Sequence, residues 1–422
     1  QAGYSVTTAD ESVLLGYQAG YSNTTGTNVA IGFQTMQNLV TGTANTAVGR
    51  KALNSADGAE NNNVAIGSSA MQNVNNDSSE KNVAIGADAM SSVTSGEVDR
   101  CIAIGFGAMD GAGSIGGQQN IFIGDNAGGG SWTTAASNSN VAIGATAMSA
   151  ALNGALGNTA VGHDGLKAVT TGDYNTTLGR GAGTAITTTS YTVAIGNYAL
   201  SALTTSGDYT IAIGHGAMGG AEIGDGNIAI GYQSMANANA SGFHRNVAIG
   251  YQTMANVGSN SAADNVAIGY QALNDINASA IGNVAIGSYS GDAITSGDYN
   301  VSIGENALGS ATSGGSNIAI GRLAAANVTT ANSNIYIGYA AGYANQTGTN
   351  NTIVGNYSLA QTAGIVNFTD VTTLGWEAGY YATGSNNTFI GSEAGRGGTT
   401  SAPFSSGQTN TAVGNEALYS FT

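Results

Sequence analysis

Cysteine and proline are almost absent from this chain, since each occurs once in 422 residues. Because Cys101 is the only thiol, no disulfide can form within the chain, which excludes a disulfide-stapled scaffold. We expect Cys101 to be a buried thiol and not a nucleophile. No apolar run reaches the roughly 18 residues that a membrane-spanning helix requires. The sequence therefore predicts no membrane insertion.

Basic residues are also scarce. Nine Lys and Arg residues stand against 25 Asp and Glu residues, which gives a formal net charge of −16. Such a chain repels the phosphates of nucleic acids and the headgroups of anionic membranes. We therefore exclude nucleic acid as a partner.

One four-residue sequence motif, as in Val29-Ala30-Ile31-Gly32, recurs along the whole chain. We count 23 copies between Gly16 and Gly414, at a mean spacing of about 18 residues. This period is typical of a solenoid, whose coils bury their apolar side chains against one another. The sequence predicts one continuous parallel β-solenoid of about 23 coils over 1–422. Because residues 1–5 repeat residues 18–22, we expect the array to be part of a longer fibre protein.

Each coil is called a rung here, and positions are counted from the motif glycine as position 0. These glycines are residues 16, 32, 49, 67, 86, 105, 124, 144, 162, 179, 196, 214, 231, 250, 269, 287, 304, 321, 338, 355, 375, 391 and 414. Positions −3 and −1 are Val, Ile, Leu or Thr in every copy, which favours a strand of four or five residues.

The other face of that strand is apolar too, because position −2 is Ala in 15 of the 23 copies. A strand with one solvated face alternates apolar and polar residues, so we expect both faces to be covered. The sequence does not decide which face points into the coil. Small residues permit close approach by a covering layer, which could be another part of the coil or another chain. Of these two, we expect the alanine face to meet another chain.

Two further positions are predicted to be structural. Position −4 is Asn in 18 copies, which fits either a ladder of stacked amides or a turn at the strand entrance. Position +4 holds all eight methionines but otherwise mostly Leu or Gly, which indicates a slot that fills the core and not a metal site. Representative repeat residues are Asn28, Val29, Ile31, Gly32 and Met36, and Asn82, Val83, Ile85, Gly86 and Met90.

Candidates for ligand binding are few. Asp173, Asp208 and Asp298 lie in Gly-Asp-Tyr turns and could bind calcium, although a Gly-Asp turn explains them as well. The aromatic residues Tyr232, Tyr251 and Tyr270 all follow motif glycines and could form a carbohydrate-stacking stripe, or pack against neighbouring loops. No catalytic constellation recurs, so we predict neither an enzyme nor a cofactor.

The phrases at 28–32 and 82–89 resemble the head repeats of trimeric autotransporter adhesins, and those at 45–49 and 410–414 are similar to repeats of bacteriophage tail fibres. The resemblance covers essentially the whole chain. It implies a left-handed parallel β-roll in which three chains share one core. The repeat here is longer than in those heads, so we expect larger outer loops.

The resemblance and the composition together predict a non-enzymatic extracellular fibre, at a cell surface or on a virion. An adhesin head and a tail-fibre shaft both fit. The expected partners are two further copies of the chain and a cell-surface glycan or host receptor. The alternative is the subunit of a filament that stacks end to end, because the end strands of a solenoid expose unpaired backbone.

Overall fold

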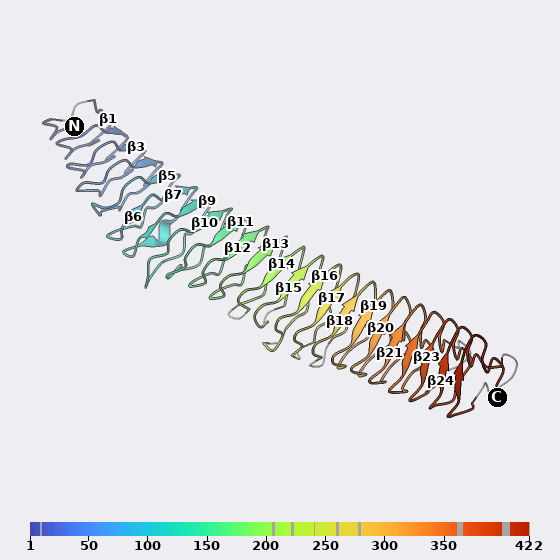
Figure 1. Cartoon of the computed structure of the whole chain (residues 1–422). Helices are drawn as coiled ribbons and strands as arrows, with labels where there is room; N and C mark the ends of the chain where they lie inside the picture. Colours follow the sequence, from blue (N-terminus) through green and yellow to red (C-terminus); the bar gives the residue numbers. More distant parts are fainter. Residues whose placement is uncertain are drawn as a thin grey trace. The chain divides into compact units, whose positions relative to one another are not determined.

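The repeat forms a parallel β-solenoid with almost no helix, as predicted (Figure 1). The computed structural model describes residues 1–8, 11–204, 207–220, 223–239, 241–258, 261–276, 280–360, 366–398 and 406–421. The chain divides into two compact units, Gln1–Thr210 and Ile211–Thr422. Each unit is described by itself.

In the described part of the first unit, eleven rung strands pair in parallel in chain order: β1 (Val13–Leu15), β2 (Val29–Ile31), β3 (Thr46–Val48), β4 (Val64–Ile66), β5 (Val83–Ile85), β7 (Ile102–Ile104), β9 (Ile121–Ile123), β10 (Val141–Ile143), β11 (Thr159–Val161), β12 (Thr176–Leu178) and β13 (Val193–Ile195). A second, short ladder joins β6 (Val98–Asp99) to β8 (Gly117–Gln118), and a 3₁₀ turn, η1, spans Asp110–Ala112.

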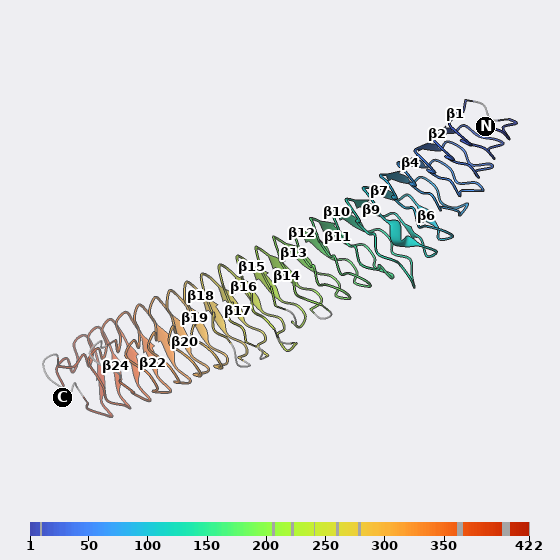
Figure 2. The same ribbon diagram turned by 180° about the vertical axis from the view of Figure 1, so that it is seen from behind.

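In the described part of the second unit, twelve strands stack in the same way: β14 (Ile211–Ile213), β15 (Ile228–Ile230), β16 (Val247–Ile249), β17 (Val266–Ile268), β18 (Val284–Ile286), β19 (Val301–Ile303), β20 (Ile318–Ile320), β21 (Ile335–Ile337), β22 (Thr352–Val354), β23 (Thr372–Leu374), β24 (Thr388–Ile390) and β25 (Thr411–Val413). Figure 2 shows from behind that, within each unit, the strands of successive rungs lie side by side.

Every strand pairs with the same motif positions of the next rung. In β2 and β3, for example, Val29 is opposite Thr46, and Ala30 is opposite Ala47. The variable repeat length is therefore absorbed entirely outside the strands. This register places equivalent side chains in rows along each unit.

The strands span three residues, which is shorter than the four or five predicted. The reason is the asparagine at position −4. The backbone N–H of Asn45 donates to the side-chain Oδ1 of Asn28 at 2.9 Å, and that of Asn63 donates to Asn45 Oδ1 at 2.9 Å. At the strand entrance the Asn side chain thus replaces the backbone acceptor for the N–H at −4, while the carbonyl oxygen of Asn45 still accepts from the backbone N–H of Val29 at 2.9 Å. Of the two structural explanations for this asparagine, the ladder is confirmed.

The orientation of the strand differs from the expected one. Position −2 points into the coil, where Ala30 and Ala84 are completely buried. The side chains at −3 and −1 point outward and are partly exposed, as in β2 and β5. The expectation that the alanine face meets another chain is therefore wrong. The alanines are inside because the space beneath them is filled from position +4, where Met36 and Met90 are also completely buried.

Core volume is shared between positions −2 and +4 of one rung. In four of the five rungs with a large residue at −2, +4 is glycine: Leu14 with Gly20, Phe122 with Gly128, Tyr336 with Gly342 and Phe389 with Gly395. The fifth rung combines Ile353 with Leu359. A Cβ added at Gly128 would lie 2.8 Å from the ring of Phe122. A rung with an aromatic ring at −2 therefore has no room for a side chain at +4, whereas the smaller Ile353 is buried together with Leu359.

The motif glycine is required on two grounds. Gly32 has φ +141, a conformation that L side chains rarely adopt. A Cβ at Gly32 would also lie only 2.5 Å from the carbonyl oxygen of Gly49 in the next rung. Gly86 has φ +136 and faces Gly105 in the same way. Successive rungs thus touch backbone to backbone at this corner.

Candidate interaction surface

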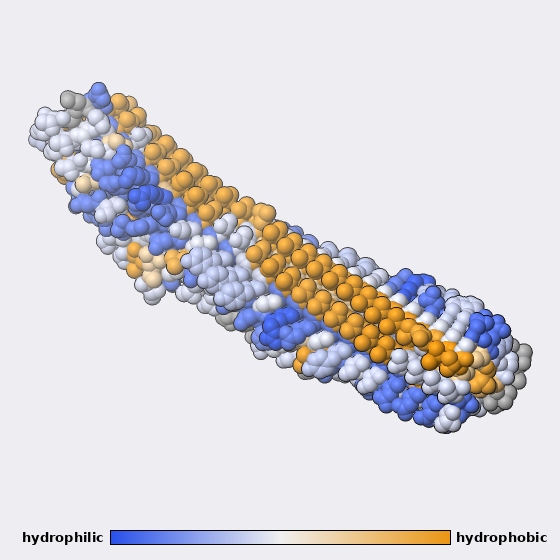
Figure 3. All heavy atoms as spheres, in the orientation of Figure 1, coloured by the Kyte–Doolittle hydropathy of each residue, from blue (hydrophilic) through white to orange (hydrophobic). Residues whose placement is uncertain are grey.

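The outward side chains at −3 and −1 form a double row of Val, Ile, Leu and Thr along each unit, which we call the apolar stripe. Its members are partly open to solvent: Ile268 is 36% exposed and Leu178 is 50% exposed. Figure 3 shows the stripe as a continuous hydrophobic band along the described strands of each unit.

The apolar stripe of one unit is as large as the largest apolar patches of soluble monomers. At about 4.8 Å per rung and roughly 10 Å of width, twelve rungs of the second unit give roughly 600 Å². The largest apolar patch of an ordinary soluble monomer is about 300–600 Å², and larger patches mark interaction sites. One unit alone reaches the top of that range.

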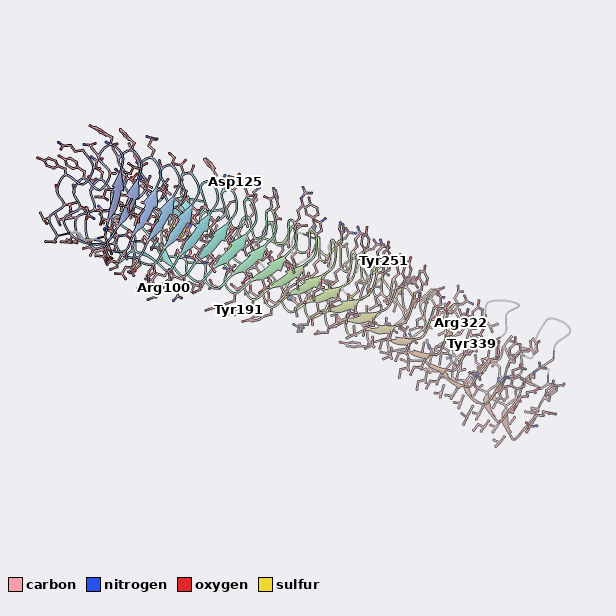
Figure 4. The ribbon with its side chains drawn as sticks, turned by 90° about the horizontal axis from the view of Figure 1, so that it is seen from above. Arg100, Asp125, Tyr191, Tyr251, Arg322 and Tyr339 are labelled. Carbon is pink, nitrogen blue, oxygen red and sulfur yellow. The ribbon has the colours of Figure 1, made fainter. Side chains whose placement is uncertain are left out.

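Two rows of larger side chains border the stripe. Position −5, before the strand, gives the leading row, and position +1, after the motif glycine, gives the trailing row. In Figure 4, Arg100 and Tyr191 of the leading row lie along one edge of the first unit, and Asp125 of the trailing row lies along the other. Tyr251, Arg322 and Tyr339 of the trailing row share one edge of the second unit.

Aromatic side chains stack from rung to rung within each row. In the leading row, the ring centroids of Tyr174 and Tyr191 are 5.3 Å apart, and those of Tyr191 and Tyr209 are 5.1 Å apart. The in-register rungs bring these rings to stacking distance although 17 or 18 residues separate them in the chain. Tyr209 is nevertheless 64% exposed, so the stack stands out from the surface.

The proposed carbohydrate residues form such a stack in the trailing row. Tyr232 and Tyr251 are 5.0 Å apart with their planes 11° apart, and Tyr251 and Tyr270 are 5.3 Å and 8° apart. The faces of Tyr251 are therefore turned toward its two neighbours. The ring edges and the phenol groups are the parts directed away from the stack.

Ion pairs also run along the rows. Arg245 Nε lies 2.7 Å from Asp264 Oδ1 in the leading row, and Arg322 Nε lies 3.0 Å from Glu305 Oε2 in the trailing row. The hydrogen bond from Arg245 lowers the pKa of the Asp264 carboxyl group. Both pairs are exposed, so they contribute little to stability by themselves. They do hold charged groups at fixed places beside the stripe.

The three candidate calcium ligands have one structural role in common. The carboxylate of each accepts a hydrogen bond from a backbone N–H of the preceding rung: Asp173 from Leu156, Asp208 from Ser190, and Asp298 from Ile281, each at 2.8 Å. Among the described residues, no group of three or more His, Cys, Asp or Glu side chains is placed to hold a metal ion. The structure does not bring these three aspartates together.

Cys101 is buried, as expected. Its thiol donates to the carbonyl oxygen of Gly117 at 3.1 Å, and burial raises its pKa to about 11. A thiol with so high a pKa is hardly ionised at neutral pH and is a poor nucleophile. This environment matches a structural role.

The sequence interpretation missed a pocket of about 210 Å³ in the second unit, lined by Leu323, Tyr339, Ala340, Tyr343, Tyr357 and Ala360. It forms at position +2, where Ala340 stands between the longer side chains of Leu323 and Tyr357. The signal was present in the sequence as a small residue between two large ones at one repeat position. Recognising it required the rungs to be aligned at that position.

A search of protein-family models and a search of curated proteins found no match to this chain. Among the described residues, no helix is long and apolar enough to cross a membrane. Function is therefore argued from the surface itself.

Proposed function

We propose that this chain is a non-enzymatic extracellular fibre protein, with a structural and adhesive role, that assembles as a homotrimer through the apolar stripe. The observation that carries the proposal is the outward face of the strands, which is aliphatic in every rung and uncovered in a single chain. The resemblance to adhesin heads and tail fibres supports the same assembly, and the proposal covers both kinds of fibre.

The energy of covering the stripe is large enough for stable association. At about 25 cal/mol per Å², roughly 600 Å² in one unit corresponds to about 15 kcal/mol of gross hydrophobic free energy. Association costs about 4–15 kcal/mol in lost translational and rotational freedom. The stripe of one unit thus offsets the cost of binding by itself.

A trimer suits the narrow form of this surface. Three stripes that each turn toward a common axis cover one another completely and leave the loops on the outside. The outer loops vary in length and sequence, and they are the part of each rung available to a receptor. Adhesion is therefore assigned to the loop side and assembly to the strand side.

The test is the native mass in solution, measured by size exclusion with light scattering. The chain has a mass of 41.6 kDa, so we expect about 125 kDa for a closed trimer of point-group symmetry. The stripe variant Ile268→Lys with Ile286→Lys places two charges per chain in the interface. An unpaired buried charge costs several kcal/mol, so this variant should elute as a monomer.

The matched control is Ser296→Lys with Ser313→Lys, which adds the same charge at exposed loop positions of the same unit. We expect it to keep the mass of the wild type. Circular dichroism checks that all three proteins retain β-structure. A wild-type mass near that of one chain, or a stripe variant that stays trimeric, contradicts the proposal.

A further inference from the structure

The two rows beside the apolar stripe have the composition of a protein interface. They comprise 46 positions of the 422, yet they hold six of the nine basic residues and nine of the 19 tyrosines. The basic residues are Arg50, Lys81, Arg100, Arg180, Arg245 and Arg322. Tyr and Arg are enriched at interfaces, whereas Lys is depleted. Their concentration along both edges of an aliphatic surface indicates that these edges are also contact surfaces.

Rotational symmetry fixes which residues can meet. Within one unit, rotation about an axis parallel to the stacked rungs leaves every rung of that unit at its own height. The leading row of one chain then faces the trailing row of the next chain, and each rung meets the same rung of its neighbour. Position −5 of a rung is therefore opposite position +1 of that rung in the partner.

The sequence is complementary under this pairing. Arg180 would face Tyr174, and Arg245 would face Tyr251. Four of the five acidic residues in the rows would face a phenol or indole group: Glu11 with Tyr17, Asp264 with Tyr270, Glu305 with Tyr299, and Asp370 with Trp376. No rung pairs two like charges, and no rung pairs two aromatic residues.

The available side-chain atoms fit these contacts. Because Tyr251 is stacked on both neighbours, its phenol oxygen and ring edge are what it offers to a partner. A guanidinium N–H can donate to that oxygen, and a phenol O–H can donate to a carboxylate. Arg322 already makes the first kind of contact within one chain, where Nη1 lies 3.4 Å from Tyr339 Oη.

We propose that the leading and trailing rows form an interchain contact that sets the register of the trimer, each rung pairing with the same rung of the next chain. This inference rests on the proposed function, because it requires parallel copies joined through the stripe. It adds the residues that select the register. The stripe alone cannot select it, since its aliphatic residues repeat in every rung and tolerate a shift by one rung.

Disulfide trapping tests the pairing on the full chain. Positions −5 and +1 lie on opposite sides of a three-residue strand, and the extended residues from −4 to 0 alone span about 13 Å. A disulfide needs Cα atoms within about 7 Å, so a cysteine pair at these positions cannot close within one chain. The same-rung variant is Arg245→Cys with Tyr251→Cys in the second unit. Tyr174→Cys with Arg180→Cys repeats the test in the first unit.

The matched control is Arg245→Cys with Ser288→Cys, which offsets the pair by two rungs, or about 10 Å. Arg245→Cys with Tyr270→Cys tests an offset of one rung. After mild oxidation, non-reducing gels should show most of each same-rung variant as a covalent trimer and the offset variants as single chains. Wild type, with buried Cys101 alone, gives the background.

The outcomes separate this inference from the proposed function. A trimeric native mass with closure only in an offset variant, or with no closure in either same-rung variant, overturns the register and leaves the trimer standing. A covalent dimer from the same-rung variants overturns the threefold arrangement. A monomeric native mass overturns both proposals.

Discussion

The shared core volume of positions −2 and +4 predicts a rescue between two destabilising substitutions. In the rung of Gly86, Ala84 and Met90 are both completely buried. Ala84→Phe puts an aromatic ring into space that Met90 fills, and such overpacking costs about 3 kcal/mol. Met90→Gly empties the slot, which costs about 2–5 kcal/mol for a large-to-small core change. Met90 has φ 52, so glycine also relieves about 1 kcal/mol of backbone strain.

The double variant recreates the arrangement of Phe122 and Gly128 in a rung that has Ala and Met. We expect it to lie within about 2 kcal/mol of the wild type, whereas additive costs give about 4–7 kcal/mol. Global unfolding of a long repeat array is not two-state. Hydrogen exchange of the amides in this rung, such as the Gly86 N–H that donates to the carbonyl oxygen of Ile66 at 2.8 Å, measures the local free energy instead.

The control combines Met90→Gly with Ala142→Phe, which lies three rungs away in the same unit. These two changes share no space and should simply add. If Ala84→Phe with Met90→Gly is as unstable as the sum of its single variants, the shared-volume explanation is wrong.

Three further predictions concern single residues. Cys101 should resist alkylation at pH 8 in the folded protein and react on unfolding, because burial raises its pKa to about 11; rapid native labelling contradicts this. Burial raises the pKa of Asp292 to about 6 from 3.8, so the folded state binds the proton more tightly and stability falls as pH rises from about 4 to 6. Asp292→Asn should therefore stabilise by about 1 kcal/mol at pH 7, allowing for partial exposure, and by nothing at pH 4 in thermal scans; equal gains at both pH values refute the titration. Asn283→Leu removes the Oδ1 that accepts from the backbone N–H of Asn300 at 2.9 Å, together with its other ladder bonds. It should cost about 3 kcal/mol in local hydrogen exchange, and unchanged protection contradicts the ladder's role.

The strands, their register and the role of the motif glycine were predictable, because all three follow from the glycine at position 0 of every repeat. Gly32 has both a positive φ and a backbone neighbour too close for a Cβ, so no other residue substitutes and the repeat is visible. The buried methionine slot was predictable for a similar reason, since Met36 exchanges only with residues that suit a core.

Which face of the strand points into the coil was not predictable. Both faces are apolar, so the alternation of side chains along the strand does not distinguish the inner face from the outer face. What decides it is the corner after the strand, where residues such as Gln34 and Met36 adopt positive φ and return the chain beneath the alanines. That conformation is unusual for residues other than glycine. The amino-acid types at these positions do not indicate a positive φ.

Part of the trailing row was predictable, because Tyr232, Tyr251 and Tyr270 all follow motif glycines. The leading row and the pocket were missed, because they form only between rungs. Tyr339 and Tyr357 are 18 residues apart, in repeats of unequal length, and their rings come within 4.9 Å of each other through the register of the strands. Tyr339 and Tyr357 occupy different repeat positions, +1 and +2, so their contact is not visible from the repeat pattern alone.

The amide ladder has a consequence for how such a chain changes over evolutionary time. Position −4 is Asn in 18 of the 23 copies, and its side chain bonds the backbone of the next rung. Most rungs therefore offer their successors the same set of donors and acceptors. Removal or duplication of one whole repeat joins two surfaces that already match. A gene made of such repeats can therefore gain or lose length in unequal recombination without a new folding problem at the junction. The length of the protein can therefore change by single rungs during evolution. The sequences of the outer loops can change separately.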